Sequence, residues 1–244
     1  MPWARCWARK PIENPGPPKR MNREAAFPFL ESIPMIEQFG LYVILTDPAA
    51  GYETCARAAV DEGIRYLQLR MKNQPCNTVL VMAEKIRAIT LDTPTRFIMN
   101  DDVEIAAAVD ADGVHLGQND LPLDAAKTQW PLPGKYFGLS THSLEQARAA
   151  WALEPDYIGV GPVFPTPTKA IPDPVLGLEN LAAIVRQSPV TSVAIGGIDE
   201  RNLPLVLEKG AVNFSAVRAV GGSTEPARAM RRLMDIWRAF SQER

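Results

Sequence analysis

Short apolar runs and amphipathic stretches alternate along the chain from Leu41 onward. Each run holds four to seven residues, mostly aliphatic, aromatic or β-branched, and ends in a small or polar cluster, as buried strands do. The predicted strands are Leu41–Thr46, Ile64–Arg70, Arg96–Asn100, Gly113–Leu116, Tyr136–Ser140, Tyr157–Gly161, Ser192–Gly196 and Val212–Val217. The predicted helices are Tyr52–Glu62, Thr78–Ile89, Val103–Val109, Leu123–Gln129, Leu144–Leu153, Leu178–Gln187, Arg201–Lys209 and Glu225–Phe240.

This alternation predicts one α/β domain, a (β/α)8 TIM barrel. Strands joined by helical crossovers run parallel, and eight such units are the number that closes a barrel with its helices outside. An open doubly wound sheet is the alternative. It usually has fewer strands and a glycine-rich first turn, whereas the first turn here is Thr46-Asp47-Pro48.

The first forty residues differ in composition from the rest. Residues 1–20 contain five prolines and five Lys or Arg against one Glu. A basic, proline-rich segment cannot bury a core, so residues 1–40 are predicted to be a flexible extension and lead-in, and residues 41–244 the barrel domain. The first twenty residues are either a tail or sequence upstream of a start at Met21.

Composition and charge mainly exclude classes of protein. The chain is 46% hydrophobic and 22% charged, which is typical of globular proteins, and its net charge of −2 gives no broad attraction to nucleic acid. No apolar run approaches the roughly 18 residues that cross a membrane. The three cysteines are odd in number and lack CxxC spacing, which favours free thiols and a cytoplasmic location.

Polar side chains follow the predicted strands, at the end where barrel enzymes place their active sites. Arg70, Lys72 and Lys169 all lie there, and three converging cations suit a ligand with several negative charges, such as a diphosphate. Solvated surface cations are the alternative interpretation.

Two carboxylates, Asp101 and Asp120, follow neighbouring strands. Carboxylates combined with phosphate oxygens and water are a common way of holding Mg²⁺. Asp101 also suits the N-cap of the following helix, although Asp102 is available for that role.

The remaining candidate groups point to positioning rather than to covalent catalysis. Gly196-Gly197 and Gly221-Gly222 follow the seventh and eighth strands, where barrels of this kind often bind a phosphate. His115 lies within a strand and is expected to be packed and hydrogen-bonded, whereas His142 lies in a loop, where facing a ligand and facing solvent are equally expected. No Ser–His–Asp order or HExxH spacing is present, so an electrostatic site is expected.

Six short motifs follow one another at matched spacing between Leu41 and Phe240. They are Gln68-Leu69-Arg70-x-Lys72, Asn100-Asp101, Asp112-Gly113-Val114-His115-Leu116-Gly117-Gln118-x-Asp120, Gly138-x-Ser140-x-His142, Gly159-x-Gly161-Pro162 with Thr166-x-Thr168-Lys169, and Ile195-Gly196-Gly197-Ile198. Together they resemble the thiamine phosphate synthase family. Members are (β/α)8 barrels that couple hydroxymethylpyrimidine diphosphate to thiazole phosphate and release pyrophosphate.

The resemblance implies a role for each matching residue. It implies Mg²⁺ as cofactor, with Asp101 and Asp120 as its ligands, and a dissociative reaction through a pyrimidine carbocation. Contacts to the pyrimidine diphosphate would come from Gln68, Arg70, Lys72, Asn100, Ser140 and Lys169. Among these, Arg70, Lys72, Ser140 and Lys169 would act in the chemical step. Contacts to the thiazole phosphate would come from Thr166, Thr168, Gly197 and the backbone at Val217 and Arg218.

One position departs from the family pattern, and two other functions stay open. Many members have Ser where this chain has Arg218, whose guanidinium would either strengthen phosphate binding or crowd the site. A related thiazole tautomerase without metal is one alternative, kept open by His142 and opposed by Asp120 and Lys72. A non-catalytic phosphate-binding barrel is the other. The expected partners are small phosphorylated substrates, with no nucleic acid or membrane, and a homodimer is one possible assembly.

Overall fold

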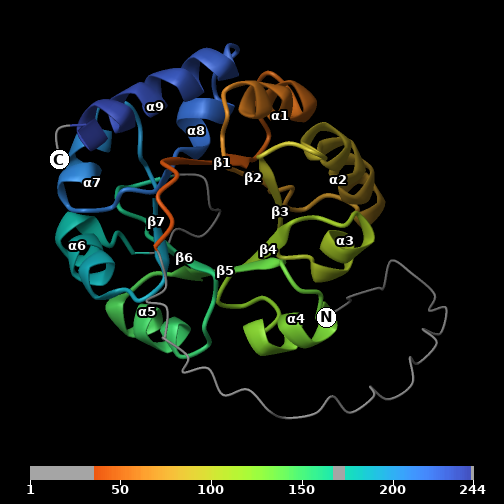
Figure 1. Cartoon of the computed structure of the whole chain (residues 1–244), viewed down its shortest axis with the longest axis horizontal. Coiled ribbons are helices and arrows are strands. Elements are labelled where there is room, and N and C mark those ends of the chain that lie inside the picture. The colour runs from red at the N-terminus through yellow and green to blue at the C-terminus, as the bar shows by residue number, and fades with distance from the viewer. Residues whose placement is uncertain (1–35, 167–173, 243–244) are drawn as a thin grey trace, which may run out of the picture. The chain divides into compact units, whose positions relative to one another are not determined.

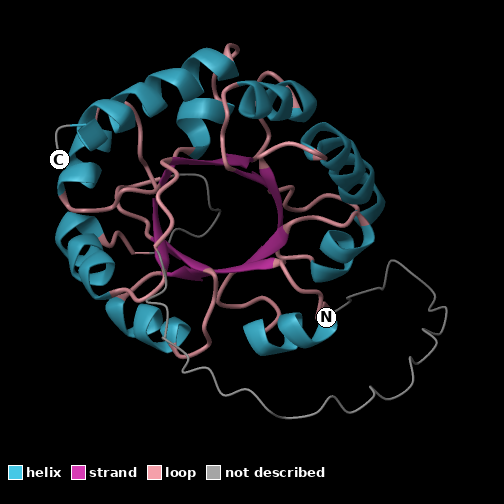
Figure 2. Cartoon of the chain, in the orientation of Figure 1, coloured by secondary structure: helices cyan, strands magenta, loops and turns pink. Residues whose placement is uncertain are grey.

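The computed structural model describes residues 36–166 and 174–242 of the 244-residue chain. Eight parallel strands close into a barrel in sequence order, and helices surround the ring of strands (Figures 1 and 2). The predicted (β/α)8 fold is confirmed. The strands are β1 Leu41–Leu45, β2 Tyr66–Leu69, β3 Arg96–Asn100, β4 Gly113–Leu116, β5 Tyr136–Thr141, β6 Tyr157–Val160, β7 Thr191–Ile195 and β8 Phe214–Ser215. The helices are α1 Tyr52–Asp61, α2 Cys76–Thr90, α3 Val103–Ala108, α4 Leu123–Gln129, α5 Leu144–Trp151, α6 Gly177–Gln187, α7 Leu203–Glu208, α8 Val217–Gly221 and α9 Pro226–Gln242.

The alternation of side chains along each strand produces two apolar layers. In β1, Leu41, Val43 and Leu45 belong to the large core shared with the helices. Tyr42 and Ile44 lie between them in sequence and belong to a separate cluster of inward-facing residues. The barrel interior is therefore packed with side chains, and the space for a ligand lies at its mouth.

The last strand of the barrel is shorter than the sequence predicts. The run predicted as a strand at Val212–Val217 forms only the two-residue β8, and the chain turns at Ala216 into the short helix α8. Val217, the last residue of the predicted strand, is therefore the first residue of a helix whose Val220 and Gly221 are buried. This helix was not predicted.

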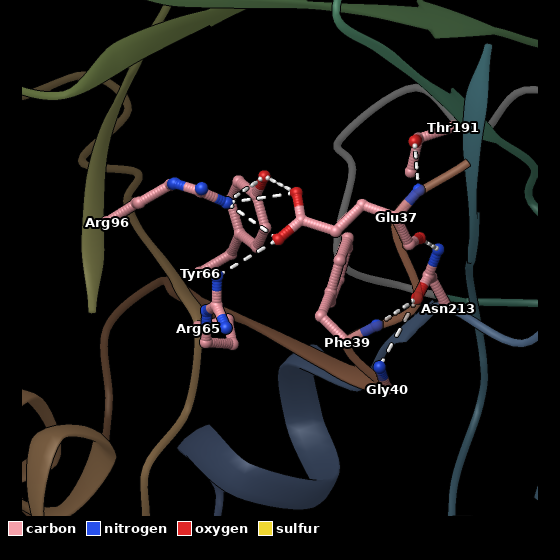
Figure 3. A network of polar contacts seen from close by, with 8 residues as sticks. All are labelled: Glu37, Phe39, Gly40, Arg65, Tyr66, Arg96, Thr191 and Asn213. Carbon is pink, nitrogen blue, oxygen red and sulfur yellow. Dashed lines mark hydrogen bonds and ion pairs between the residues drawn. The ribbon is translucent and has the colours of Figure 1, made fainter. Parts of the chain in front are cut away.

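Residues 36–40, the last part of the predicted lead-in, pack against residues at the amino-terminal ends of several strands (Figure 3). Phe39 is buried, and the Asn213 side chain accepts from the backbone N–H groups of Phe39 and Gly40. Glu37 receives hydrogen bonds from Tyr66 at 2.6 Å and Arg96 at 2.8 and 2.9 Å. The composition of the chain predicts a lead-in before Leu41, but it does not predict that residues 36–40 make these tertiary contacts.

Glu37 is expected to contribute to stability. Burial works to raise the pKa of Glu37, but hydrogen bonds from Tyr66 and Arg96 and the charges of Arg96 and Arg65 outweigh it, so this pKa lies below its ordinary 4.5. Glu37→Gln should lower the free energy of unfolding by about 1–2 kcal/mol, between the values for surface and buried pairs.

The pH dependence of that loss follows from the direction of the shift. A lowered pKa contributes stability that is complete above 4.5 and disappears as the pH falls through the folded-state value. Urea unfolding across this range should therefore show the wild type and Glu37→Gln converging in acid. Glu179→Gln, which removes the exposed pair with Lys209, is the control and should have no measurable effect. An equal effect of both variants would contradict this role for Glu37.

Two further expectations were tested by the structure. Within the described residues, no helix is long and apolar enough to cross a membrane. Cys55 is buried and free, as predicted.

Candidate functional site

A cavity of about 780 Å³ lies at the carboxyl ends of the strands. Parallel strands all end on this side of the barrel, so residues that follow different strands meet there. Among its lining residues are Thr46, Arg70, Ser140, His142, Thr166, Gly197, Arg201, Ser215, Val217 and Arg218. The cavity is thus lined mainly by the segments that follow β1 and β5 to β8.

Gly197 forms one wall of the cavity, with a backbone conformation that requires glycine. Its φ is +66°, and a Cβ atom there would lie 2.7 Å from the Phe164 Cβ and 2.8 Å from the Pro165 carbonyl oxygen. The segment after β7 therefore presents bare backbone to the cavity, beside Val217 and Arg218. Exposed backbone N–H groups next to a guanidinium suit a phosphate.

Three arginines line the cavity. The Arg70 guanidinium donates to the Thr46 hydroxyl at 3.4 Å. Arg201 donates to Asp199 at 2.7 and 3.3 Å, which neutralises part of its charge. Arg218 makes no side-chain ion pair with another described residue. The cavity therefore combines an apolar interior with positive charge at its edge.

A pair of carboxyl groups lies at the ends of β3 and β4. Asp101 has a φ of +63°, and Asp102 caps α3 by accepting from the Ile105 N–H at 2.9 Å. The capping role considered for Asp101 thus belongs to Asp102. Asp120 accepts from the Gly117 N–H at 2.7 Å, and a Cβ on Gly117 would lie 2.8 Å from that oxygen.

The two carboxyl groups share a hydrogen bond and have opposite pKa shifts. Burial and the bond to Asp120 raise the pKa of Asp101 to about 6, despite the contact with the Lys72 ammonium. Burial also works to raise the pKa of Asp120, but the hydrogen bonds from Asp101 and Gly117 and the charge of Lys72 hold it below its usual value. Asp101 is therefore the carboxyl group of the pair that takes up a proton first as the pH falls.

This carboxyl pair fits a hard divalent cation. Two adjacent carboxyl groups concentrate negative charge, and a cation bound between them would take the place of the Lys72 ammonium. Within residues 36–166 and 174–242, no cluster of three or more His, Cys, Asp or Glu is suited to a metal. The protein would supply few ligands, leaving positions for water and phosphate oxygens, as is common for Mg²⁺.

The two histidines differ in their surroundings. His115 is hydrogen-bonded through both ring nitrogens, to Tyr157 at 3.1 Å and Ser140 at 2.9 Å, as expected for a packed residue. His142 lines the cavity, and its Nδ1 donates to the Gly161 carbonyl at 2.6 Å. Ser140 lies between them, with its backbone carbonyl accepting from Gln118 at 2.5 Å.

A family model described as thiamine monophosphate synthase matches residues 41–220, which is the barrel from β1 to α8 without the last helix, α9. The chain belongs to this family. The match extends over more than two thirds of the sequence and includes both sides of the site.

Individual members of the thiamine monophosphate synthase family agree with this assignment. The thiamine-phosphate synthase of Archaeoglobus fulgidus is 36% identical over 207 residues, covering 84% of this chain and 97% of that protein. Its counterpart in Pelotomaculum thermopropionicum is 43% identical over 180 residues, covering 72% and 81%. Among solved structures, the thiamine phosphate pyrophosphorylase of Pyrococcus furiosus superposes with a TM-score of 0.75 at 35% identity, covering 83% of this chain and 96% of that one.

In this family member, the candidate residues fall into two groups around the mouth. Arg70, Ser140, Thr166, Gly197, Val217 and Arg218 line the cavity. Lys72, Asn100, Asp101 and Asp120 lie on the adjacent part of the rim, after β2, β3 and β4. Gln68 is buried inside the barrel, where its amide donates to Tyr42 at 3.0 Å. Thr168 and Lys169 lie outside the described residues.

Ser215 lines the cavity and was missed by the sequence analysis. Its hydroxyl is buried and has no hydrogen-bond partner within the described residues. A buried hydroxyl without a partner costs about 1–3 kcal/mol, and a bound substrate can satisfy it. The only sequence signal was its place on the last predicted strand.

Ser215→Ala is expected to raise the substrate KM severalfold while leaving the melting temperature unchanged or slightly higher, because the lost hydroxyl bonds only to ligand. Ser192 provides a matched control, since its hydroxyl is also buried and unpartnered in the described part of the chain but does not line the cavity. Steady-state kinetics and thermal unfolding of both variants test this. If Ser192→Ala raised the KM by the same factor, the assignment of Ser215 as a substrate contact would be wrong.

Proposed function

We propose that this protein is a thiamine phosphate synthase, joining hydroxymethylpyrimidine diphosphate to thiazole phosphate with release of pyrophosphate. The observation that carries the proposal is the carboxyl pair with Lys72 beside a cavity edged by Arg70 and Arg218. Such a rim suits two phosphorylated substrates, one of which must lose a highly charged leaving group. Family membership and the relatives named above support this reaction.

The residues divide between the substrates according to their place. Arg70, Lys72 and Ser140, with Lys169, would hold the diphosphate, and Asn100 and Gln68 would complete this side. Gly197 and the backbone at Val217 and Arg218, with Thr166 and Thr168, would hold the thiazole phosphate. This division gives each phosphorylated substrate a cation of its own, because Lys72 lies beside the carboxyl pair and Arg218 lines the cavity beside Gly197.

The metal site follows from the carboxyl pair. Asp101 and Asp120 would hold Mg²⁺, which would supply positive charge to the departing pyrophosphate. The Lys72 ammonium lies against Asp101 and is in place to contact the same leaving group. Burial of both carboxyl groups strengthens these charge interactions relative to water.

The rest of the site suits a dissociative reaction. Cations stabilise the leaving group, and the apolar lower cavity around Ile44, Ile195 and Val217 excludes water from the pyrimidine cation until the thiazole nitrogen captures it. No protein nucleophile is required for this step. Arg218 would add a two-point contact to the thiazole phosphate where many members have serine.

The thiazole tautomerase remains a second candidate because His142 lines the cavity. A tautomerase moves a proton within one thiazole substrate and needs neither a diphosphate nor a metal. The two functions can be separated by product analysis. With both substrates and Mg²⁺, a synthase forms thiamine phosphate, whereas a tautomerase isomerises the thiazole alone and forms none.

Lys72→Ala should sharpen this test. We expect its kcat/KM for the diphosphate substrate to fall about a hundredfold, because a charge-assisted contact to the leaving group is lost. Lys85→Ala is the control, since Lys85 pairs with Glu53 on the outside of the barrel. If both variants formed thiamine phosphate at the wild-type rate, the assignment of Lys72 would fail.

A further inference from the structure

A continuous chain of hydrogen bonds runs through the barrel interior and ends at the cavity. The Gln68 amide donates to the Tyr42 hydroxyl at 3.0 Å, and the Tyr42 and Tyr157 hydroxyls lie 2.8 Å apart. The Tyr157 hydroxyl lies 3.1 Å from His115 Nδ1, and His115 Nε2 lies 2.9 Å from the Ser140 hydroxyl. Of these five residues, Ser140 alone lines the cavity.

The chemistry of the donors fixes the direction of the chain. The Gln68 NH₂ group only donates, so the Tyr42 oxygen accepts from it. Tyr42 is fully buried, and the acceptor within its reach is the Tyr157 oxygen. Tyr157 then has a hydrogen to donate to His115 Nδ1, since Tyr42 already donates to it. The Nδ1 of His115 is therefore an acceptor, and its ring hydrogen lies on Nε2, facing Ser140.

We propose that this one-way chain places the ring hydrogen of His115 on Nε2 and leaves the Ser140 hydroxyl free to donate to the substrate. The Ser140 oxygen accepts from His115, so its own hydrogen must point elsewhere, and the cavity is the open direction. The part concerning substrate rests on the proposed function. Tyr42, Tyr157 and His115 are then positioning residues that act through Ser140.

Two features of the barrel support this chain of hydrogen bonds. Burial raises the pKa of Tyr42 and of Tyr157, so both hydroxyls keep their hydrogens at neutral pH. The His115 ring stacks on Tyr157 at 5.5 Å between centroids, and Gly138 makes room for this stack. A Cβ on Gly138 would lie 2.2 Å from the Tyr157 ring and 2.6 Å from His115 Nδ1.

The tautomer can be read directly by ¹⁵N NMR of the free protein at alkaline pH. The sequence contains two histidines, so the ring spectrum holds two sets of signals. We expect His115 as Nε2–H and His142, which donates from Nδ1 to Gly161, as the opposite tautomer and internal reference. His115 found as Nδ1–H would mean that the chain runs the other way, from Ser140 to Gln68, and would overturn the proposal.

Two tyrosine variants test the direction. Tyr157→Phe removes the donor to Nδ1, so His115 should lose its preference for Nε2–H. Tyr42→Phe leaves the Tyr157 hydroxyl with His115 as its acceptor, so the His115 tautomer should not change. Thermal unfolding verifies that each variant folds. Equal behaviour of the two variants in the His115 signals would overturn the one-way chain.

The link to substrate is tested by a double-mutant cycle. Tyr157→Phe should lower kcat/KM for the diphosphate substrate about tenfold, the size of one hydrogen bond, and should have little further effect in Ser140→Ala. Additive effects would overturn the action through Ser140. An inactive wild type would instead contradict the proposed function, and the tautomer result would stand independently of it.

Discussion

Asp101→Asn or Asp120→Asn should reduce the rate of thiamine phosphate formation at least about a thousandfold while the barrel stays folded. Removing a ligand of a phosphate-bound Mg²⁺ takes away several kcal/mol of leaving-group stabilisation, and about 4 kcal/mol corresponds to this factor. Asparagine is chosen because, like aspartate, it tolerates the positive φ of Asp101, whereas alanine would add strain. Kinetics at saturating Mg²⁺, with circular dichroism for folding, measure the effect.

Asp102→Asn is the matched control. It removes one negative charge next to the site, and asparagine still caps α3 by accepting from Ile105. Its turnover should stay near wild type. A rate near wild type for Asp101→Asn or Asp120→Asn would contradict the metal assignment, and a loss as large for Asp102→Asn would mean that local charge alone matters.

Gly197→Ala should have the second largest effect, raising the KM for thiazole phosphate ten- to a hundredfold and lowering stability. An alanine Cβ would lie 2.7 Å from Phe164 and 2.8 Å from the Pro165 oxygen, so the segment after β7 must move. The positive φ adds about 1 kcal/mol of strain, and the displaced backbone loses its fit to the phosphate.

Gly210→Ala separates strain from displacement. Gly210 also has a positive φ, of +88°, but the nearest atom to an added Cβ lies 4.0 Å away, on Val185. This variant should lose about 1 kcal/mol of stability and keep its KM. If Gly197→Ala also lost only about 1 kcal/mol of stability and kept its KM, the backbone at Gly197 would not contribute to phosphate binding. Chemical denaturation and steady-state kinetics give both quantities.

The fold could be predicted because each strand and helix has a pattern of its own. The boundaries failed where tertiary packing decides the structure, as at Val217, where an apolar run becomes a helix. The contacts of residues 36–40 could not be predicted for the same reason, since Glu37 is held by Tyr66 and Arg96 from distant parts of the sequence.

Part of the candidate site could also be predicted from the sequence, and part could not. Lys72, Asp101 and Asp120 could be expected together because they follow adjacent strands, and the structure brings them into contact. Their roles stay predictions. The buried chain from Gln68 to Ser140 could not be foreseen, because it depends on which inward-facing residues of different strands lie at the same level. The unpartnered Ser215 hydroxyl is another feature of this kind.

Pyrophosphate release by the purified full chain tests the central claim most directly. The assay compares the complete mixture with mixtures lacking the pyrimidine diphosphate, the thiazole phosphate or Mg²⁺, and quantifies thiamine phosphate in each. A synthase of the proposed kind should release one pyrophosphate per thiamine phosphate in the complete mixture and little in the other three. Pyrophosphate release that does not depend on Mg²⁺, or a complete mixture that forms no thiamine phosphate, would contradict the account.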